Sequence, residues 1–288
     1  MDLSNLNFSN TEVSTLSPQE TDINISNLIS GRTNVLDPNW TTAYSELERH
    51  LRTGDIVLVH GRYPFSWVVE LLQWSSWGHS AMVVLAKDLD PENHFGLPPI
   101  MLWESNTGNQ EIPNRWPALG PVKEGPMLID LKDRLQHSQG SYKDVQIVHR
   151  PLFNCPDIDG RGLQDFFTSQ INKGFPSDKE VIFSVYMGRK YNRSTSSAIG
   201  GMFFIFNSFT GDFTEMLADS PGMQPAVDMD PNKIYCSELV AATYKQMGLL
   251  TKTWVNNAYS PKDFSAEGTM RLLNRAYLGE QMYINMFQ

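Results

Sequence analysis

The sequence contains little cysteine, no surplus of basic charge and no long apolar run. Two cysteines, Cys155 and Cys236, occur in 288 residues, so a framework of several disulfides is excluded. Lys and Arg number 23 against 32 Asp and Glu, which gives a formal net charge of −9. Because phosphate binding needs clustered Lys and Arg, and the sequence has no such cluster, nucleic acid is not expected as a partner.

The hydrophobic runs are too short for a membrane-spanning helix. "DIVLV", "AMVVLA" and "MFFIF" are all far below the roughly 18 residues that such a helix requires. The N-terminal "MDLSNLNFSNTEVSTLSPQE" has no basic segment followed by an apolar core, unlike a secretory signal. We therefore expect a cytoplasmic protein with free thiols. Delivery as an effector and packaging into a virion are alternatives.

The N-terminal segment differs in composition from the rest of the chain. Residues 1–38 are rich in Ser, Asn, Thr and Asp without a sustained apolar period, so we expect a disordered polar arm. Beyond it, strands are expected at 55–61, 80–88, 100–106, 126–130 and 144–152. Helices are expected at about 41–54, 65–76, 160–174 and 236–247, with a short one after the strand within 126–136 and another within 260–277. This mixture predicts an α+β fold with an antiparallel sheet, packed against the helix that begins near Cys236.

Cys236 is the first chemically informative residue. It stands at the start of the "YCSELVAATYKQ" helix, where unpaired backbone N–H groups and the positive end of the helix dipole stabilise a thiolate. The same N–H groups can form an oxyanion hole. A nucleophilic thiol also needs a base and an orienting group. His79 in "WGHSAMVV" and Glu104 in "LWESN" are candidates if their strands are neighbours.

Four segments, "GDIVLVHG", "WGHSAMVV", "LWESN" and "YCSELV", resemble the permuted papain-like superfamily. The most similar branch is the YiiX/YebB-like one, related to NlpC-type cell-wall peptidases and to the lecithin:retinol acyltransferase group. There the histidine strand precedes the cysteine helix, the reverse of papain's order, and this sequence has the permuted order. The resemblance covers roughly 52–265. It implies a single circularly permuted papain-like (NlpC-type) catalytic domain over 39–288, with an insertion at about 189–230.

The resemblance also implies a reaction and its residues. Cys236 would be the nucleophile, His79 the general base and later acid, and Glu104 the group that orients the imidazole. The expected activity is a cysteine-dependent hydrolase or acyltransferase that cleaves an amide or ester through a thioester. No cofactor is expected, and the sequence has no metal-ligand spacing, phosphate-binding glycine loop or GxSxG elbow.

Other residues near these motifs have competing interpretations. His60, at the end of "DIVLVH", is a rival base, and Glu104 could be a solvated carboxylate at a strand end. Tyr235, Ser237 and Trp77 are candidates for substrate or oxyanion contacts, with packing as the alternative. Asp55 is expected in the turn before a strand, with a position at the border of the cleft as the alternative, and Cys155 is expected to be a structural or bystander thiol.

The substrate is the least determined feature. The apolar run "GGMFFIFNSF" and the tryptophans at 67, 74 and 77 favour a lipid-like or N-acyl substrate with peripheral membrane contact, although core packing explains both equally well. A peptide substrate for a peptidase or deamidase is the first alternative. A non-catalytic binding or effector protein that uses the papain-like cleft is the second. The sequence does not specify an oligomeric state.

Overall fold

A computed structural model describes residues 41–60, 77–107, 112–116, 124–141, 145–177, 180–181, 230–268 and 270–286. All of them belong to one compact unit, 35–288. The expected arm at 1–38, the expected helix at 65–76 and, apart from Asp230, the expected insertion at 189–230 lie outside the described residues.

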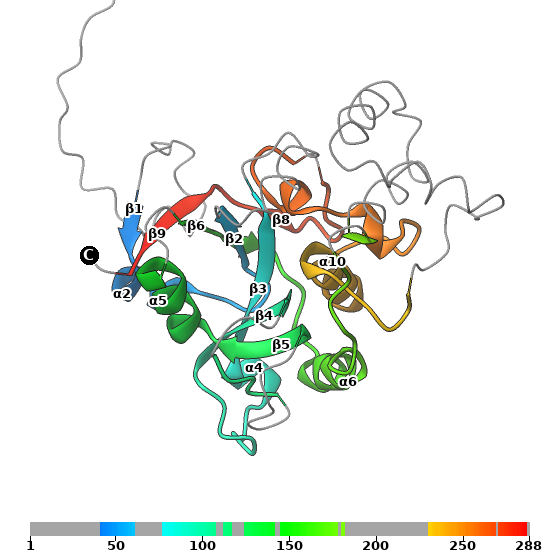
Figure 1. The fold of residues 1–288 in the computed structure, drawn as a ribbon, viewed down its shortest axis with the longest axis horizontal. Helices are drawn as coiled ribbons and strands as arrows, with labels where there is room; N and C mark the ends of the chain where they lie inside the picture. Colours follow the sequence, from blue (N-terminus) through cyan, green and yellow to red (C-terminus); the bar gives the residue numbers. More distant parts are fainter. Residues whose placement is uncertain are drawn as a thin grey trace, which may run out of the picture. The chain divides into compact units, whose positions relative to one another are not determined.

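The centre of the unit is a seven-stranded sheet with strand order β1-β9-β6-β2-β3-β4-β5 (Figure 1). Its strands are β1 (Thr41–Ala43), β2 (Ile56–His60), β3 (His79–Leu85), β4 (Ile100–Asn106), β5 (Gly125–Asp130), β6 (Gln146–Arg150) and β9 (Met282–Asn285). The β1–β9 pair is parallel and all other pairs are antiparallel. The predictions of an α+β fold and of an antiparallel sheet built mainly from residues 54–150 are confirmed.

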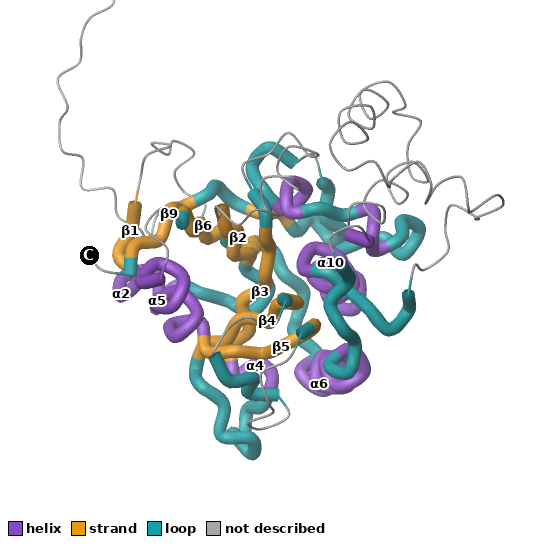
Figure 2. The backbone as a smooth tube through the Cα atoms, in the orientation of Figure 1, coloured by secondary structure: helices purple, strands orange, loops and turns teal. Residues whose placement is uncertain are grey.

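Helices lie on both faces of this sheet (Figure 2). The longer ones are α5 (Leu131–Ser141), α6 (Gly160–Gln170) and α10 (Cys236–Gln246). Short turns of helix are α2 (Tyr44–Leu47), η1 (Glu48–His50), α4 (Ala86–Leu89), η2 (Asn256–Ala258) and η3 (Pro261–Phe264), and β7 (Leu152–Phe153) pairs with β8 (Tyr277–Leu278). Figure 1 shows α5 on one side of the sheet, with α6 and α10 on the other.

The strand alternation divides the buried side chains between the two faces. Met82 pairs with Trp103, and both belong to the core that α10 and α6 cover. Trp103 stacks on Phe167 of α6 with ring centroids 4.1 Å apart, and its indole N–H donates to Thr243 of α10 at 3.1 Å. The packing of the 236–247 helix against the central strands, expected from the sequence, is thereby confirmed.

A buried carboxylate fixes the start of β2 beside α10. Asp55 is 1% exposed and accepts hydrogen bonds from the Leu152 backbone at 2.8 Å and the Arg52 backbone at 3.0 Å. It also bonds to His149 at 2.7 Å. One residue earlier, Gly54 has φ +99°, and its carbonyl accepts from the Tyr244 hydroxyl of α10 at 2.5 Å. Asp55 therefore has a structural role, linking the start of β2 to His149 and Leu152, and is not a cleft residue.

Two expected helices are wrong. The segment 41–54 forms β1, one turn of α2 and the 3₁₀ turn η1, because Thr41–Ala43 pairs with β9 instead of starting a helix. In the tail, only η3 is helical within 260–268 and 270–277, and the chain then enters β8 and β9. Asn274 and Arg275, with φ of 58° and 60°, adopt left-handed conformations that a helix does not contain.

Candidate active site

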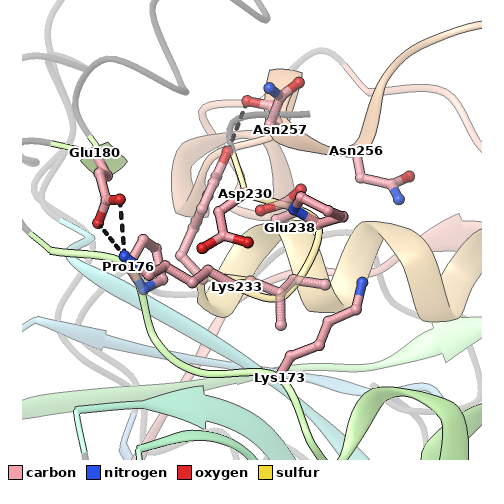
Figure 3. Close-up of a pocket in the computed structure, with 11 residues that line it drawn as sticks. Lys173, Pro176, Glu180, Asp230, Lys233, Glu238, Asn256 and Asn257 are labelled. Carbon is pink, nitrogen blue, oxygen red and sulfur yellow. Dashed lines mark hydrogen bonds and ion pairs between the residues drawn. The ribbon is translucent and has the colours of Figure 1, made fainter. Parts of the chain in front are cut away.

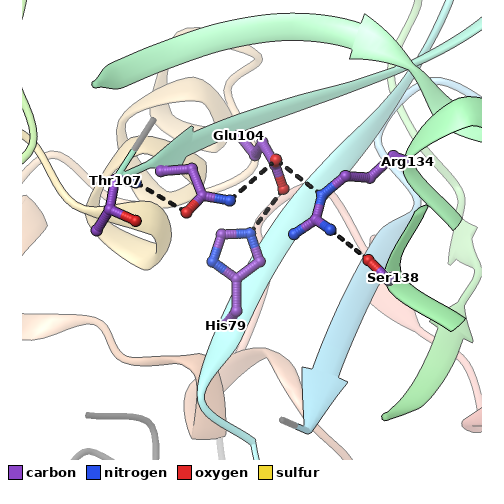
Figure 4. A network of polar contacts seen from close by, with 6 residues as sticks. His79, Glu104, Thr107, Arg134 and Ser138 are labelled. Carbon is purple, nitrogen blue, oxygen red and sulfur yellow. Dashed lines mark hydrogen bonds and ion pairs between the residues drawn. The ribbon is translucent and has the colours of Figure 1, made fainter. Parts of the chain in front are cut away.

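His79 and Glu104 lie on the same face of the sheet, on neighbouring strands. Val83 pairs with Leu102, so odd-numbered residues of β3 share a face with even-numbered residues of β4. This register brings the His79 ring to the Glu104 carboxylate, and Nε2 lies 2.8 Å from Oε2. Glu104 is fully buried, and the side chain of His79 is 18% exposed. Figure 4 shows the pair.

Cys236 reaches the same imidazole from the first turn of α10. The two side chains are close enough for each to shift the pKa of the other, and since Nε2 is bonded to Glu104, Nδ1 is the ring nitrogen left for the sulfur. The helix cap, Tyr235, makes no side-chain capping bond. The backbone N–H groups of Ser80 and Ser237 act on the sulfur and lower the pKa of the thiol.

The electrostatics of the three side chains favour a thiolate–imidazolium pair. Burial alone would raise the pKa of the Cys236 thiol, but the His79 charge and its hydrogen bond, together with the Ser80 and Ser237 N–H groups, lower it. Burial alone would lower the pKa of His79, but Cys236 and Glu104 raise it to about 9. Both shifts favour a proton on the ring over a proton on the sulfur.

Glu104 is itself held by a second layer of polar groups (Figure 4). Its Oε1 accepts from Arg134 Nε at 3.0 Å and from Asn106 Nδ2 at 3.2 Å, and Arg134 donates onward to the Ser138 hydroxyl. Burial would raise the pKa of Glu104, yet Arg134, His79 and Asn106 lower it to about 2. One oxygen is thus bonded to the guanidinium while the other orients the imidazole.

The sequence interpretation missed Arg134, although a signal for it exists. The buried positions of α5 include Leu131, Arg134, Leu135 and Ser138, an i, i+3, i+4, i+7 stripe. An arginine on a stripe that otherwise faces the core indicates a buried acidic partner.

The segment that carries the cysteine is fixed from two sides. Ser105 of β4 donates to the Ile234 carbonyl at 2.6 Å. On the other side, the Tyr235 hydroxyl donates to the Asn257 carbonyl at 2.6 Å, and the Ser237 hydroxyl donates to the Tyr259 carbonyl at 3.0 Å. These bonds set the position of the first turn of α10 relative to His79.

The remaining candidates lie around this set. The Tyr235 and Ser237 hydroxyls are bonded to backbone carbonyls, so Ser237 faces the sulfur through its N–H rather than its side chain. Trp77 is 3% exposed and belongs to the core. His60 is the last residue of β2 and follows Val59, which pairs with His79. The contacts described above for Cys236 and Glu104 are made by His79.

Cys155 and Cys236 are both free thiols, as the sequence predicted, and their surroundings differ. Burial and the nearby Asp55, Asp88 and Asp157 carboxylates raise the pKa of Cys155 to about 11. Across the described ranges, no group of three or more His, Cys, Asp or Glu side chains is arranged to hold a metal ion. None of the helices in those ranges has the length and apolar character of a membrane span.

No protein-family model and no curated protein matches the chain. Among solved structures, the chain is similar to the metalloprotein yiiX of Escherichia coli O157:H7, a DUF1105 protein, with 14% sequence identity and a TM-score of 0.35. The match covers 82% of this chain and 97% of that one. This neighbour bears the name of the branch that the sequence motifs resemble.

Proposed function

We propose that this protein is a cysteine-dependent hydrolase or acyltransferase that cleaves an amide or ester through a thioester, on a circularly permuted papain-like fold. The observation that carries the proposal is the Cys236–His79–Glu104 set, in which Glu104 is 2.8 Å from the His79 ring and His79 and Cys236 each shift the pKa of the other. The permuted order supports it, because His79 precedes Cys236 in the chain and the two meet where β3 and α10 begin.

The geometry gives each group one task in a two-step reaction. The Cys236 thiolate attacks the carbonyl carbon, and backbone N–H groups at the start of α10 stabilise the oxyanion. The His79 imidazolium donates its proton to the leaving amine or alkoxide as the C–N or C–O bond breaks. The neutral imidazole then takes a proton from water, or from an acceptor alcohol or amine, which attacks the thioester and releases the thiolate.

The test is the capture of the thioester. The protein is incubated with panels of acyl esters, acyl amides and peptides, quenched in acid, and analysed by mass spectrometry of its peptides. We expect an acyl adduct on Cys236, none in Cys236→Ala, and an unchanged adduct in Cys155→Ala. Adducts confined to another residue, or turnover that persists in a folded Cys236→Ala variant, contradict the proposal.

The base is tested with two histidine variants. His79→Ala is expected to remove nearly as much turnover as Cys236→Ala, and the double variant to be hardly worse than either, because residues that act as a unit are strongly non-additive. His60→Ala is the matched control and should retain turnover in proportion to its folded fraction. Loss of turnover in well-folded His60→Ala, with activity kept in His79→Ala, would assign the base to His60.

A further inference from the structure

Arg134 brings a positive charge to the buried side of the candidate active site. It occupies one of the buried positions of α5, and its side chain is 10% exposed. Its Nε donates to Glu104 Oε1 at 3.0 Å, and its Nη1 donates to the Ser138 hydroxyl. Figure 4 shows the guanidinium and the His79 imidazole bonded to different oxygens of the same carboxylate. Glu104 therefore lies between two cations whenever His79 is protonated.

The charges of the site balance only when Arg134 is counted. With a proton on the His79 ring and none on the sulfur, Cys236 and Glu104 carry one negative charge each, and the imidazolium carries one positive charge. Glu104 is fully buried and Cys236 is 7% exposed, so water screens a net charge poorly at this place. The guanidinium supplies the second positive charge, and the four buried side chains together are neutral.

Without Arg134 the remaining three side chains would carry a net negative charge, which the uptake of one proton relieves. The two groups that can accept this proton are the Glu104 carboxylate and the Cys236 sulfur. The ordinary pKa is 4.5 for the carboxyl group and 9.0 for the thiol, and Asn106 would still donate to the carboxylate. The sulfur is therefore the group that takes up the proton first.

We propose that Arg134 is a positioning residue that keeps Cys236 as a thiolate, because its guanidinium supplies through Glu104 the cation that neutralises the buried charges. Its effect on the sulfur can be measured without a substrate, whereas its importance for turnover rests on the proposed function. Since the charge carries this role, a lysine should replace Arg134 in part, and a neutral side chain of similar length should not.

Other charged side chains near these residues in the chain have partners of their own. Lys233, three residues before Cys236, bonds to Glu180 at 2.8 Å (Figure 3), and the two side chains are 36% and 32% exposed. On α5, the half-exposed Asp133 lies 3.5 Å from Arg115. Solvent screens such pairs, so they do not belong to the buried set. Lys233 is therefore a matched control, a cation close to the nucleophile in the chain but in contact with water.

The test is the rate of Cys236 alkylation by iodoacetamide between pH 5 and 9, with Cys155 as the internal reference. In Arg134→Met we expect the midpoint of the pH profile to rise by about one unit, the lower end of the roughly 1–3 units that a charge within about 4–6 Å produces, because Arg134 acts from behind Glu104. Below the midpoint the reaction should be about tenfold slower. Arg134→Lys should stay closer to the wild type, and Lys233→Gln should leave the midpoint nearly unchanged.

Two further variants separate the charge of Arg134 from its packing. Ser138→Ala removes the partner of Nη1 but keeps the charge, so its profile should match that of the wild type. Arg134→Gln keeps an N–H donor without the charge, so it should behave like Arg134→Met, and it carries the test if Arg134→Met does not fold. Thermal melting checks folding. An unchanged midpoint in a folded neutral variant, or an equal rise in Arg134→Lys or Ser138→Ala, overturns the inference.

The two proposals fail separately. A raised midpoint in Arg134→Met without any acyl adduct in the wild type would contradict the proposed function and leave the role of Arg134 standing. An acyl adduct on Cys236 in the wild type, with an unchanged midpoint in Arg134→Met, would contradict the role of Arg134 alone.

Discussion

The buried Arg134–Glu104–His79 chain predicts a large stability loss when its central carboxylate is removed. Glu104→Gln keeps the shape of the side chain but leaves Arg134, 10% exposed, without the carboxylate that accepts its Nε–H at 3.0 Å. Breaking a buried ion pair on one side costs about 3–5 kcal/mol. At roughly 2–4 °C per kcal/mol for a domain of comparable or slightly smaller size, the melting temperature should fall by about 6–20 °C.

The double variant separates the ion pair from simple loss of packing. Glu104→Gln combined with Arg134→Met removes both charges, so it should be more stable than the sum of the single losses predicts, by about 0.5–3 kcal/mol. Urea denaturation of the four proteins gives this coupling energy. Asp133→Asn is the control, because the Asp133 carboxylate is 48% exposed and lies 3.5 Å from Arg115, and ion pairs at the surface contribute about 0–1 kcal/mol.

The reasoning fails if Glu104→Gln loses no more stability than Asp133→Asn. Additive single losses would equally show that the 3.0 Å contact does not couple the two side chains energetically.

Two further predictions concern pH and a close backbone approach. Because the pKa of Glu104 is lowered to about 2, its carboxylate stabilises the fold. This stability is fully present above the pKa of the unfolded state, about 4.5, and is lost as pH falls toward 2. Because the pKa of His79 is raised to about 9, its imidazolium contributes stability that is full below about pH 6.5 and is lost as pH rises through 9. The melting temperature of the wild type, plotted against pH, should therefore be highest between these limits, and the plot for His79→Ala should be flatter on the alkaline side. Gly125 and Gly96 both have positive φ, so each alanine variant is strained. Gly125→Ala should destabilise the protein far more, because its added Cβ meets the Lys173 backbone, whereas the Cβ of Gly96→Ala meets nothing within 4 Å. Equal melting temperatures of the two variants would contradict this.

Local patterns predicted the central strands well. β4, Ile100–Asn106, coincides with the apolar run "IMLWESN", and β2 and β3 fall within or one residue beyond the expected segments. Each is a run of apolar residues buried on both faces, which leaves few alternatives to a central strand. The thiol at the start of α10 was equally readable, because the helix has a continuous apolar stripe and Gly248, with φ +72°, ends it.

Long-range pairing explains the failures. Thr41–Ala43 becomes a strand only because β9 supplies a parallel partner 242 residues later, as in the Thr41–Tyr283 pair. The expected tail helix likewise ends in a strand pairing, because Tyr277 pairs with Phe153 of β7. Residue spacing carries no information on such partners.

The same limit applies within the site. Cys236 and His79 could be proposed from the sequence. Arg134 could not, because it reaches Glu104 only when α5 packs against β4 and β5.

The central claim is that His79 holds Cys236 as a thiolate, and the pH dependence of alkylation tests it most directly. Folded protein is pulsed with iodoacetamide between pH 6 and 8, and the modification of each cysteine is followed by peptide mass spectrometry. Cys155, whose pKa is raised to about 11, is the internal reference, and its rate should rise about tenfold per pH unit.

With its thiol pKa lowered and the His79 pKa raised to about 9, Cys236 should react faster than Cys155 throughout this range, and its rate should rise less steeply with pH. In His79→Ala the rate should drop and acquire the rising profile of an ordinary thiol. A Cys236 rate that climbs in parallel with Cys155, or a less steep profile that survives in folded His79→Ala, would contradict the account.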